Sequence, residues 1–305
     1  MLPQRTVSYE EFKQEPDRKY ILGFNSGEDV VLHFREDGVK QSLRIEKYPW
    51  YFCVTTPDYK KNIEYFTKLV DSLMIREVEE GKNYVKLFAR NINKKVMDER
   101  HQLMIDLDEH KIQHYEADLS SLQRCLVDNK LQIEDNYRVL YFDIETDDRH
   151  GGIVIGRDRI LSIAGVDRDG KTYYYTSQDE KKLLKKFLDR IEEYDLIAGW
   201  NSEKFDVPYL KERLKKHNIW YNWSEILQLD LMQKTMELNK RNVDLIKEVR
   251  GFSLNAIAKH FLNEEKVVHE MGIYEMFEKD PALLKKYNIQ DCALHHCNSF
   301  DNLWR

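Results

Sequence analysis

Two acidic residues at the end of an apolar stretch are the first feature with chemical meaning. Residues 138–145, RVLYFDIE, predict a buried strand that carries Asp143 and Glu145 two positions apart. Side chains two apart on a strand leave the same face, so these carboxylates should repel each other unless a cation lies nearby. A bound divalent metal ion would explain the pair. The alternative is a polar turn that places acidic residues at its rim.

Asp206 is a third candidate carboxylate. It stands between a short apolar strand at 196–200 and a predicted helix at 207–217. An Asp at this position commonly caps a helix or complements its dipole. Taken alone, Asp206 therefore fits a structural role as well as a chemical one.

Two helices are expected near the end of the chain. Ser253 can cap the first of them. The second starts at Asp280-Pro281, with proline at its first position, and carries Tyr287 and Asp291 four residues apart on one face. Taken alone, such a pair is more typical of packing beside a surface charge than of a catalytic site.

The elements around these residues predict an α/β fold. Strands are expected at 159–166 and 172–177, joined by the hairpin signal Asp169-Gly170. An amphipathic helix at 179–194 precedes the strand at 196–200. Three antiparallel strands followed by a helix and a parallel strand predict a mixed sheet flanked by helices.

We expect two domains, a smaller α+β domain at 1–136 and a second domain at 137–305. In the first, 43–56 is rich in β-branched and aromatic residues and predicts a strand, and 84–90 alternates like another. Residues 58–75 predict an amphipathic helix. This first domain carries no catalytic motif that can be identified from its residues.

Composition is that of a globular protein. The chain has 305 residues, of which 42% are hydrophobic and 33% charged, with a net charge of −6. No apolar run reaches the ~18 residues of a membrane helix, and the N-terminus lacks a secretory signal, so we expect a cytoplasmic protein or one at a nucleoid or viral replication site. The negative charge argues mildly against nucleic-acid binding, but carboxylates that hold cations weaken this objection.

The cysteines and histidines give no metal site. The four cysteines form no C-x-x-C pair, and reduced thiols are expected. His295, His296 and Cys297 are adjacent on the last helix, and adjacent helical residues do not face together. Packing or surface exposure is the expected role of all three.

Taken together, the three acidic segments resemble the three exonuclease motifs of the family B DNA polymerases, which belong to the RNase H-like DEDD exonucleases. FDIET resembles the first motif, N-x-x-x-F-D ending at Asp206 the second, and Y-x-x-x-D ending at Asp291 the third. The histidine branch of these enzymes has His five residues before the last Asp, where this chain has Lys286, so it fits the tyrosine (DEDDy) branch. LDLMQKTMEL around Asp230 and YPWYFCV are also similar to family segments.

The resemblance implies an RNase H-like exonuclease domain preceded by the polymerase N-terminal domain. Asp143, Glu145, Asp206 and Asp291 would hold two divalent ions, Mg²⁺ or Mn²⁺. Asp143 would bridge them, and Tyr287 would orient the attacking water. The expected activity is metal-dependent 3′→5′ hydrolysis of DNA.

Three further residues are implied to meet the terminal nucleotides of a single-stranded or frayed DNA 3′ end: Thr146, Asn201 and Phe205. Ordinary packing at the helix start is the alternative role for Phe205. The chain shows no D-T-D or S-L-Y-P motif, so we expect no polymerase activity from it alone, and a polymerase-domain partner or a missing C-terminal half. An exonuclease of RNA ends and a non-catalytic nucleic-acid-binding or assembly module remain the alternatives.

Overall fold

The chain divides into two compact units, residues 2–135 and 136–305. The computed structural model describes residues 4–15, 18–89, 96–134, 136–152, 154–241, 251–267 and 269–299. No helix within these ranges is both long enough and apolar enough to cross a bilayer. Each unit is built from sheets and helices and is described in turn.

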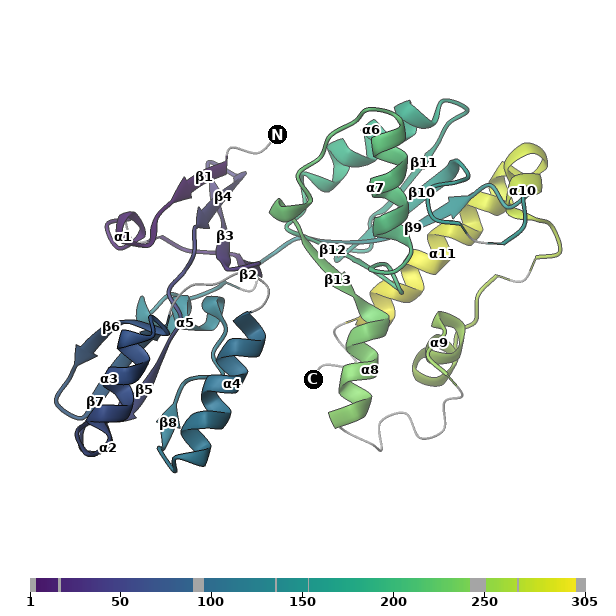
Figure 1. Ribbon diagram of the computed structural model, residues 1–305. Coiled ribbons are helices and arrows are strands. Elements are labelled where there is room, and N and C mark those ends of the chain that lie inside the picture. Colours follow the sequence, from purple (N-terminus) through teal and green to yellow (C-terminus); the bar gives the residue numbers. More distant parts are fainter. Residues whose placement is uncertain are drawn as a thin grey trace. The chain divides into compact units, whose positions relative to one another are not determined.

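The N-terminal unit starts with a four-stranded sheet in the order β1-β4-β3-β2 (Figure 1). β1 runs parallel to β4, and the other pairs are antiparallel. Val30, Leu32, Leu43 and Ile45 on this sheet are buried against Cys125 of a helix, α5. The elements are β1 (Gln4–Val7), α1 (Tyr9–Phe12), β2 (Leu22–Ser26), β3 (Asp29–Glu36), β4 (Val39–Ile45) and α5 (Ser121–Asp128).

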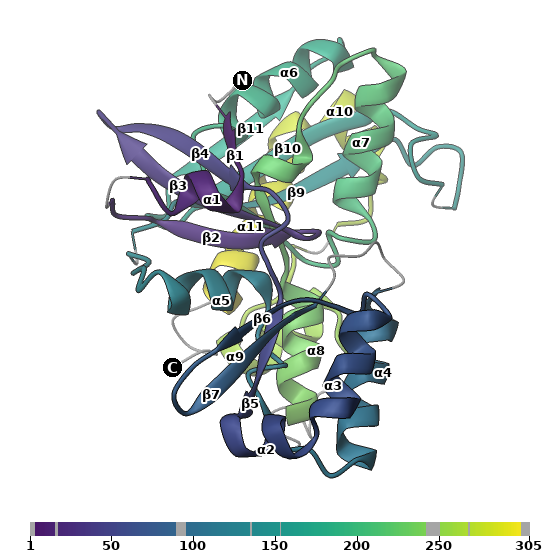
Figure 2. The ribbon, with the colours of Figure 1, turned by 60° about the vertical axis from the view of Figure 1, so that its left-hand side comes forward.

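A second antiparallel sheet completes this unit, in the order β6-β7-β5-β8. Phe52 and Val54 of β5 lie in one buried cluster with Phe66 of α3 and Leu107 of α4. Both helices lie beside this sheet (Figure 2). The elements are β5 (Tyr51–Thr55), α2 (Thr56–Lys61), α3 (Ile63–Asp71), β6 (Ile75–Glu80), β7 (Tyr84–Ala89), α4 (Val96–Glu109) and β8 (His114–Tyr115).

Two predicted elements of this unit are each split in two. The strand expected at 43–56 is interrupted because Lys47 takes a left-handed φ of 47° and Pro49 has no N–H for a ladder bond. The helix expected at 58–75 is broken at Asn62, whose ψ of 30° is not helical, and it stops before β6 begins at Ile75. The apolar periodicity of the sequence predicted neither break.

The C-terminal unit contains a five-stranded mixed sheet in the order β11-β10-β9-β12-β13. β9, β10 and β11 are antiparallel, whereas β12 runs parallel to β9 and to β13. The predicted order of strand directions is therefore confirmed, as is the hairpin, in which Gly170 takes a φ of 81°. The strands are β9 (Val139–Thr146), β10 (Ile160–Asp167), β11 (Thr172–Thr176), β12 (Leu196–Gly199) and β13 (Leu227–Asp230).

Helices cover both faces of this sheet: α6 and α7 lie on one side and the long α11 on the other (Figure 1). The predicted cap at Ser253 is present, since its Oγ accepts from Ala256 N at 3.2 Å. α11 begins at Pro281 as predicted, and Asp280 Oδ1 accepts from Leu283 N at 3.0 Å. The helices are α6 (Glu180–Ile191), α7 (Asp206–Lys216), the 3₁₀ turn η1 (Trp223–Glu225), α8 (Leu231–Arg241), α9 (Leu254–Leu262), α10 (Ile273–Lys279) and α11 (Pro281–Ser299).

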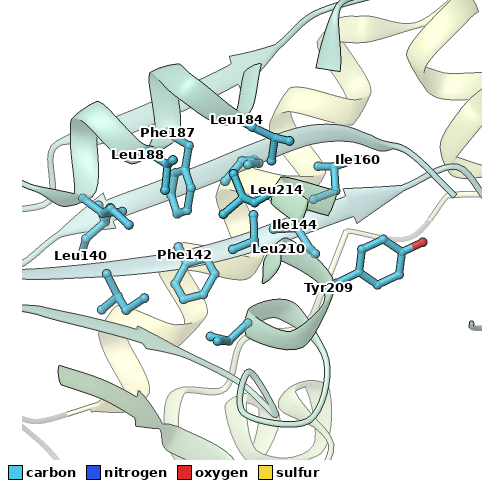
Figure 3. Packing of buried hydrophobic residues seen from close by; sticks show 14 of the residues in the cluster. Leu140, Phe142, Ile144, Ile160, Leu184, Phe187, Leu188, Tyr209, Leu210 and Leu214 are labelled. Atoms are coloured by element: carbon cyan, nitrogen blue, oxygen red, sulfur yellow. The ribbon is translucent and has the colours of Figure 1, made fainter. Parts of the chain in front are cut away.

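The alternation of β9 determines what each face of the sheet carries. Leu140, Phe142 and Ile144 pack against α6 and α7, with the Phe142 and Phe187 ring centroids 5.7 Å apart (Figure 3). The intervening residues, Asp143 and Glu145, therefore leave the opposite face, toward α11. Burial of the apolar face thus sets the direction of both carboxylates.

Candidate active site

Three carboxylates converge between β9 and α11. Oxygen atoms of Asp143, Glu145 and Asp291 lie within 4.8 Å of one another. Asp143 and Glu145 come from β9, and Asp291 from the middle of α11. The structure thus brings together residues that are almost 150 positions apart in the sequence. The periodicity of the strands and helices did not predict this proximity.

Asp206 approaches the same strand from the other direction. It is the first residue of α7 and is 3% exposed, and its Oδ1 accepts from the backbone N–H of Ile144 at 3.3 Å. The helix N-cap is Phe205, which makes no side-chain capping bond. The carboxylate of Asp206 is therefore directed at β9 between Asp143 and Glu145, and capping does not account for its position.

The loop that delivers Asp206 is tightly built. A Cβ atom on Gly199 would lie 2.8 Å from the Ser202 Cβ and 3.2 Å from the Phe142 carbonyl oxygen, so glycine permits the close approach to β9. Asp230 at the end of β13 accepts from the backbone N–H groups of Asn201 and Glu203, each at 3.1 Å. A buried carboxylate thereby fixes the path of this loop.

Tyr287 and Asp291 share one face of α11, as their spacing predicts. Asp291 is 2% exposed, and its Oδ1 has no hydrogen-bond partner among the described residues. Tyr287 is half-buried, with its ring edge-to-face against His269 at a centroid distance of 4.7 Å. A buried, unsatisfied carboxylate oxygen is costly unless a cation binds it.

The electrostatics of this cluster favour a cation. Burial, followed by repulsion from Glu145, Asp206 and Asp291, raises the pKa of Asp143 well above its usual range. Burial and neighbouring carboxylates likewise raise the pKa of Glu145 to about 8, and burial raises that of Asp206 to about 7. The pKa of Asp291 is raised by burial, despite the opposing effect of Lys266. Four carboxylates held together in this way need positive charge to remain ionised at neutral pH.

Sequence reasoning missed two residues that contact the carboxylates. Asn288, which is fully buried, donates from Nδ2 to Asp143 Oδ2 at 2.9 Å and accepts from Ser162 Oγ at 3.1 Å. Lys266 places Nζ 2.6 Å from Asp291 Oδ2. Ser162, a polar residue inside an apolar strand, is the one signal in the sequence that could have revealed the first contact.

The residues expected at the substrate end lie on the elements that carry the carboxylates. Thr146 ends β9, and Asn201 takes a left-handed φ of 59° in the loop before α7. Phe205 is half-buried against the core, 5.4 Å from the Tyr209 ring. Packing, the alternative role for Phe205, is therefore present, and contact of these three residues with DNA stays a prediction.

The structure describes the side chains of His295 and of three cysteines, and all of them are buried. His295 is buried, which lowers its pKa to about 3 and keeps it neutral. Cys53, Cys125 and Cys292 are buried free thiols. The side chains of His296 and Cys297 lie outside the described residues.

Comparison with known proteins indicates the superfamily of the chain. The model of the RNase H superfamily matches residues 140–296, just over half of the chain. A DNA polymerase of Methanocaldococcus jannaschii is 31% identical over 205 residues, which cover 58% of this chain and 12% of that protein. A DNA polymerase of Red sea bream iridovirus is 23% identical over 210 residues, covering 52% of this chain and 21% of the polymerase.

Among solved structures, the family B DNA polymerase of the hyperthermophilic archaeon Pyrobaculum calidifontis matches 90% of this chain and 44% of its own, with a TM-score of 0.57 and 18% identity. The chain thus spans less than half the length of this polymerase and about an eighth to a fifth of the two relatives above. The mixed fold and the resemblance to family B DNA polymerases are both confirmed. The chain belongs to the RNase H superfamily.

Proposed function

We propose that this protein is a metal-dependent 3′→5′ exonuclease that hydrolyses phosphodiester bonds at DNA ends. The observation that carries the proposal is the carboxylate cluster, in which Asp143, Glu145 and Asp291 lie within 4.8 Å of one another and Asp206 reaches the same strand. Its relatives are DNA polymerases, which supports a DNA substrate and a proofreading context.

The donor set fits divalent ions such as Mg²⁺ or Mn²⁺, because all four groups are carboxylates and hard cations prefer oxygen ligands. Asp143, Glu145 and Asp291 would hold one ion, with Asp143 shared by a second ion that Asp206 completes. When bound, two such ions stabilise the attacking and the leaving oxygen of an in-line displacement. The unsatisfied Oδ1 of Asp291 and the raised carboxylate pKa values support this assignment.

Other side chains of the site would prepare the reaction. Burial, then the charges of Glu145 and Asp291, raises the pKa of Tyr287, so its hydroxyl stays protonated at neutral pH. Tyr287 would therefore orient the attacking water by a hydrogen bond rather than deprotonate it. Lys266 would offset part of the negative charge that a phosphate meets on entering the site.

The substrate we propose is a single-stranded or frayed 3′ end. Thr146, Asn201 and Phe205 would meet its last nucleotides without reading their sequence. Residues 1–136 would correspond to the N-terminal domain of a family B polymerase and 137–305 to its exonuclease domain. A polymerase domain, in the same protein or in a partner, would supply the ends to be proofread, wherever the DNA is replicated.

Digestion of a 5′-labelled single-stranded DNA tests the proposal. The intact protein with Mg²⁺ or Mn²⁺ should give a ladder that shortens from the 3′ end. Asp143→Asn and Asp206→Asn should each slow cleavage by at least ~100-fold. Loss of a residue that only hydrogen-bonds to a metal ligand already costs ~10–100-fold. A chelator should abolish cleavage in the intact protein.

The matched control is Asp189→Asn, which removes an exposed carboxylate of α6. It should cleave like the intact protein. Equal cleavage by the Asp143→Asn variant would contradict the proposal, and internal cuts would point to an endonuclease. Faster digestion of an RNA of the same sequence would favour the alternative of an RNA-end exonuclease.

A further inference from the structure

A groove lies at the C-terminal end of α7 and along the segment that follows it. Its volume is about 400 Å³. The helix contributes Lys211, Leu214 and Lys215, and the segment from Asn218 contributes three aromatic rings. These rings belong to Trp220, Tyr221 and Trp223. None of these residues takes part in the carboxylate site.

The groove exposes aromatic surface that a monomer would normally bury. Trp220 is 68% exposed, whereas large aromatic side chains are mostly buried in folded proteins. Tyr221 and Trp223 are half-buried, and their ring centroids lie 5.0 Å apart in an edge-to-face pair. A flat, apolar ligand face could stack on the exposed indole ring.

The charge along the groove is positive. Its lining contains two lysines and no carboxylate. Lys211 Nζ lies 5.3 Å from the Trp223 ring centroid, and partial burial lowers the Lys211 pKa, so this cation would gain from an anionic partner. Lys215 is 3.9 Å from Glu212, but both are exposed and such pairs are weak.

A cavity in the N-terminal unit has the opposite character. It measures about 670 Å³, and its lining includes tyrosines, one lysine and three carboxylates: Lys86, Glu79, Glu116 and Asp128. Those carboxylates would repel phosphates. Of these two cavities, only the groove beside α7 combines aromatic rings and lysines in a lining that contains no carboxylate.

We propose that this groove binds single-stranded nucleic acid, with bases stacked on Trp220 and phosphates beside Lys211 and Lys215. Single strands present both unpaired base faces and a dense negative charge, and proteins hold them with this pair of features. α7 is 11 residues long, from Asp206 to Lys216, so the groove lies about 15 Å along the helix from the carboxylate site. The proposal rests on the proposed function only in that the same strand would serve as substrate.

Fluorescence anisotropy of a labelled oligothymidylate tests it, with the full chain in chelator so that no cleavage occurs. Trp220→Ala should weaken binding roughly tenfold, the loss of about one stacked base. Trp220→Phe should recover most of it. The double variant Lys211→Gln/Lys215→Gln should weaken binding at low salt and reduce the magnitude of the slope of log K against log[salt] by up to ~1.4.

The control is Lys181→Gln/Lys182→Gln, which removes two exposed lysines from α6. It should leave binding within about twofold of the intact protein. Unchanged binding by the Trp220→Ala variant, or equal weakening by both lysine pairs, would overturn the proposal. Sedimentation showing that Trp220→Ala dissolves a self-associated form without affecting oligonucleotide binding would also overturn it, in favour of an interface between copies.

The two proposals fail separately. Because binding is measured without metal, a protein that lacks exonuclease activity can still bind through the groove. Conversely, Asp143→Asn should slow cleavage by at least ~100-fold without removing the dependence of the anisotropy titration on Trp220. If the intact protein binds through Trp220 but does not cleave DNA, the exonuclease proposal alone is wrong. If the intact protein cleaves DNA but binds equally well after Trp220→Ala, the groove proposal alone is wrong.

Discussion

At the scale of single residues, the site depends on an amide that holds a carboxylate. Asn288 is fully buried and connects Ser162 of β10 to Asp143 of β9 from its position on α11. The hydrogen bond that Asn288 Nδ2 donates to Asp143 Oδ2 restricts the rotation of that carboxylate. Such contacts orient metal ligands, so their loss lowers the affinity for the ion as well as the stability of the fold.

Asn288→Ala should lower the cleavage rate ~10–100-fold and raise the Mg²⁺ concentration needed for half-maximal activity. It should also lower the free energy of unfolding by about 1–3 kcal/mol, because Ser162 and Asp143 lose a buried partner. Mg²⁺ titration of the cleavage rate and urea unfolding check both effects.

Asn129→Ala is the control for stability alone. Asn129 Nδ2 donates to the Tyr48 hydroxyl and to the Cys125 carbonyl in the other unit. This variant should lose stability without changing the Mg²⁺ requirement. If Asn288→Ala behaves in the same way, Asn288 supports the fold and does not position Asp143.

At the scale of elements, three segments must be held in register for the carboxylates to meet. β9 is fixed by strands on both sides, and α11 packs across β9 and β10. The loop before α7 has no such ladder. Asp230 holds this loop instead, because its carboxylate accepts hydrogen bonds from Asn201 N and Glu203 N. It also accepts from Gln233 N of α8 at 3.2 Å.

Asp230→Ala should therefore disturb the delivery of Asp206. We expect a loss of about 2 kcal/mol in the free energy of unfolding, since a helix cap and two loop contacts disappear. Cleavage should fall at least tenfold even where the protein remains folded. Asp230→Asn, which keeps an acceptor oxygen, should recover part of both losses.

The matched comparison is Ser253→Ala, which removes the cap of α9. It should cost about 1 kcal/mol of stability and leave cleavage within a few-fold of the intact protein. Urea unfolding and the DNA ladder assay measure both variants under the same conditions. Similar losses of activity at equal stability would mean that Asp230 acts only as a helix cap.

At the scale of the whole molecule, the clustered carboxylates oppose folding when no cation is bound. Glu145 has its pKa raised from an ordinary 4.5 to about 8, and Asp206 from 3.8 to about 7. Over the pH range between these values, the unfolded chain has released protons that the folded protein retains. Stability contributed by these groups is therefore present at low pH and falls as pH rises from about 4 to 8.

In chelator, we expect Glu145→Gln to flatten this fall, so that the variant is more stable than the intact protein at pH 8 and similar at pH 4. Millimolar Mg²⁺ should raise the melting temperature of the intact protein at pH 8 and have a smaller effect on the variant. Thermal unfolding at several pH values gives both comparisons. Glu212→Gln, an exposed position on α7, is the control, and a pH profile shared by all three proteins would refute the expectation.

The sequence by itself determined the strand and helix types of the C-terminal unit and which residues share a face. This is because local periodicity reports burial: the apolar alternation of β9 forces Asp143 and Glu145 to one side, and helical spacing puts Tyr287 and Asp291 together. The same reasoning missed the breaks at Lys47 and Asn62, where backbone dihedrals rather than apolar pattern end an element.

Only the tertiary structure decided that the carboxylates meet and what surrounds them. From the sequence, Asp206 could have been only a helix cap. No sequence pattern marked Asn288 or Lys266, because their partners lie on distant segments. Long-range contacts depend on sheet order and helix packing, which the apolar periodicity of the sequence and the helix and strand propensities of its residues do not determine. The exposed Trp220 belongs to the same class, since exposure is a property of the assembled fold.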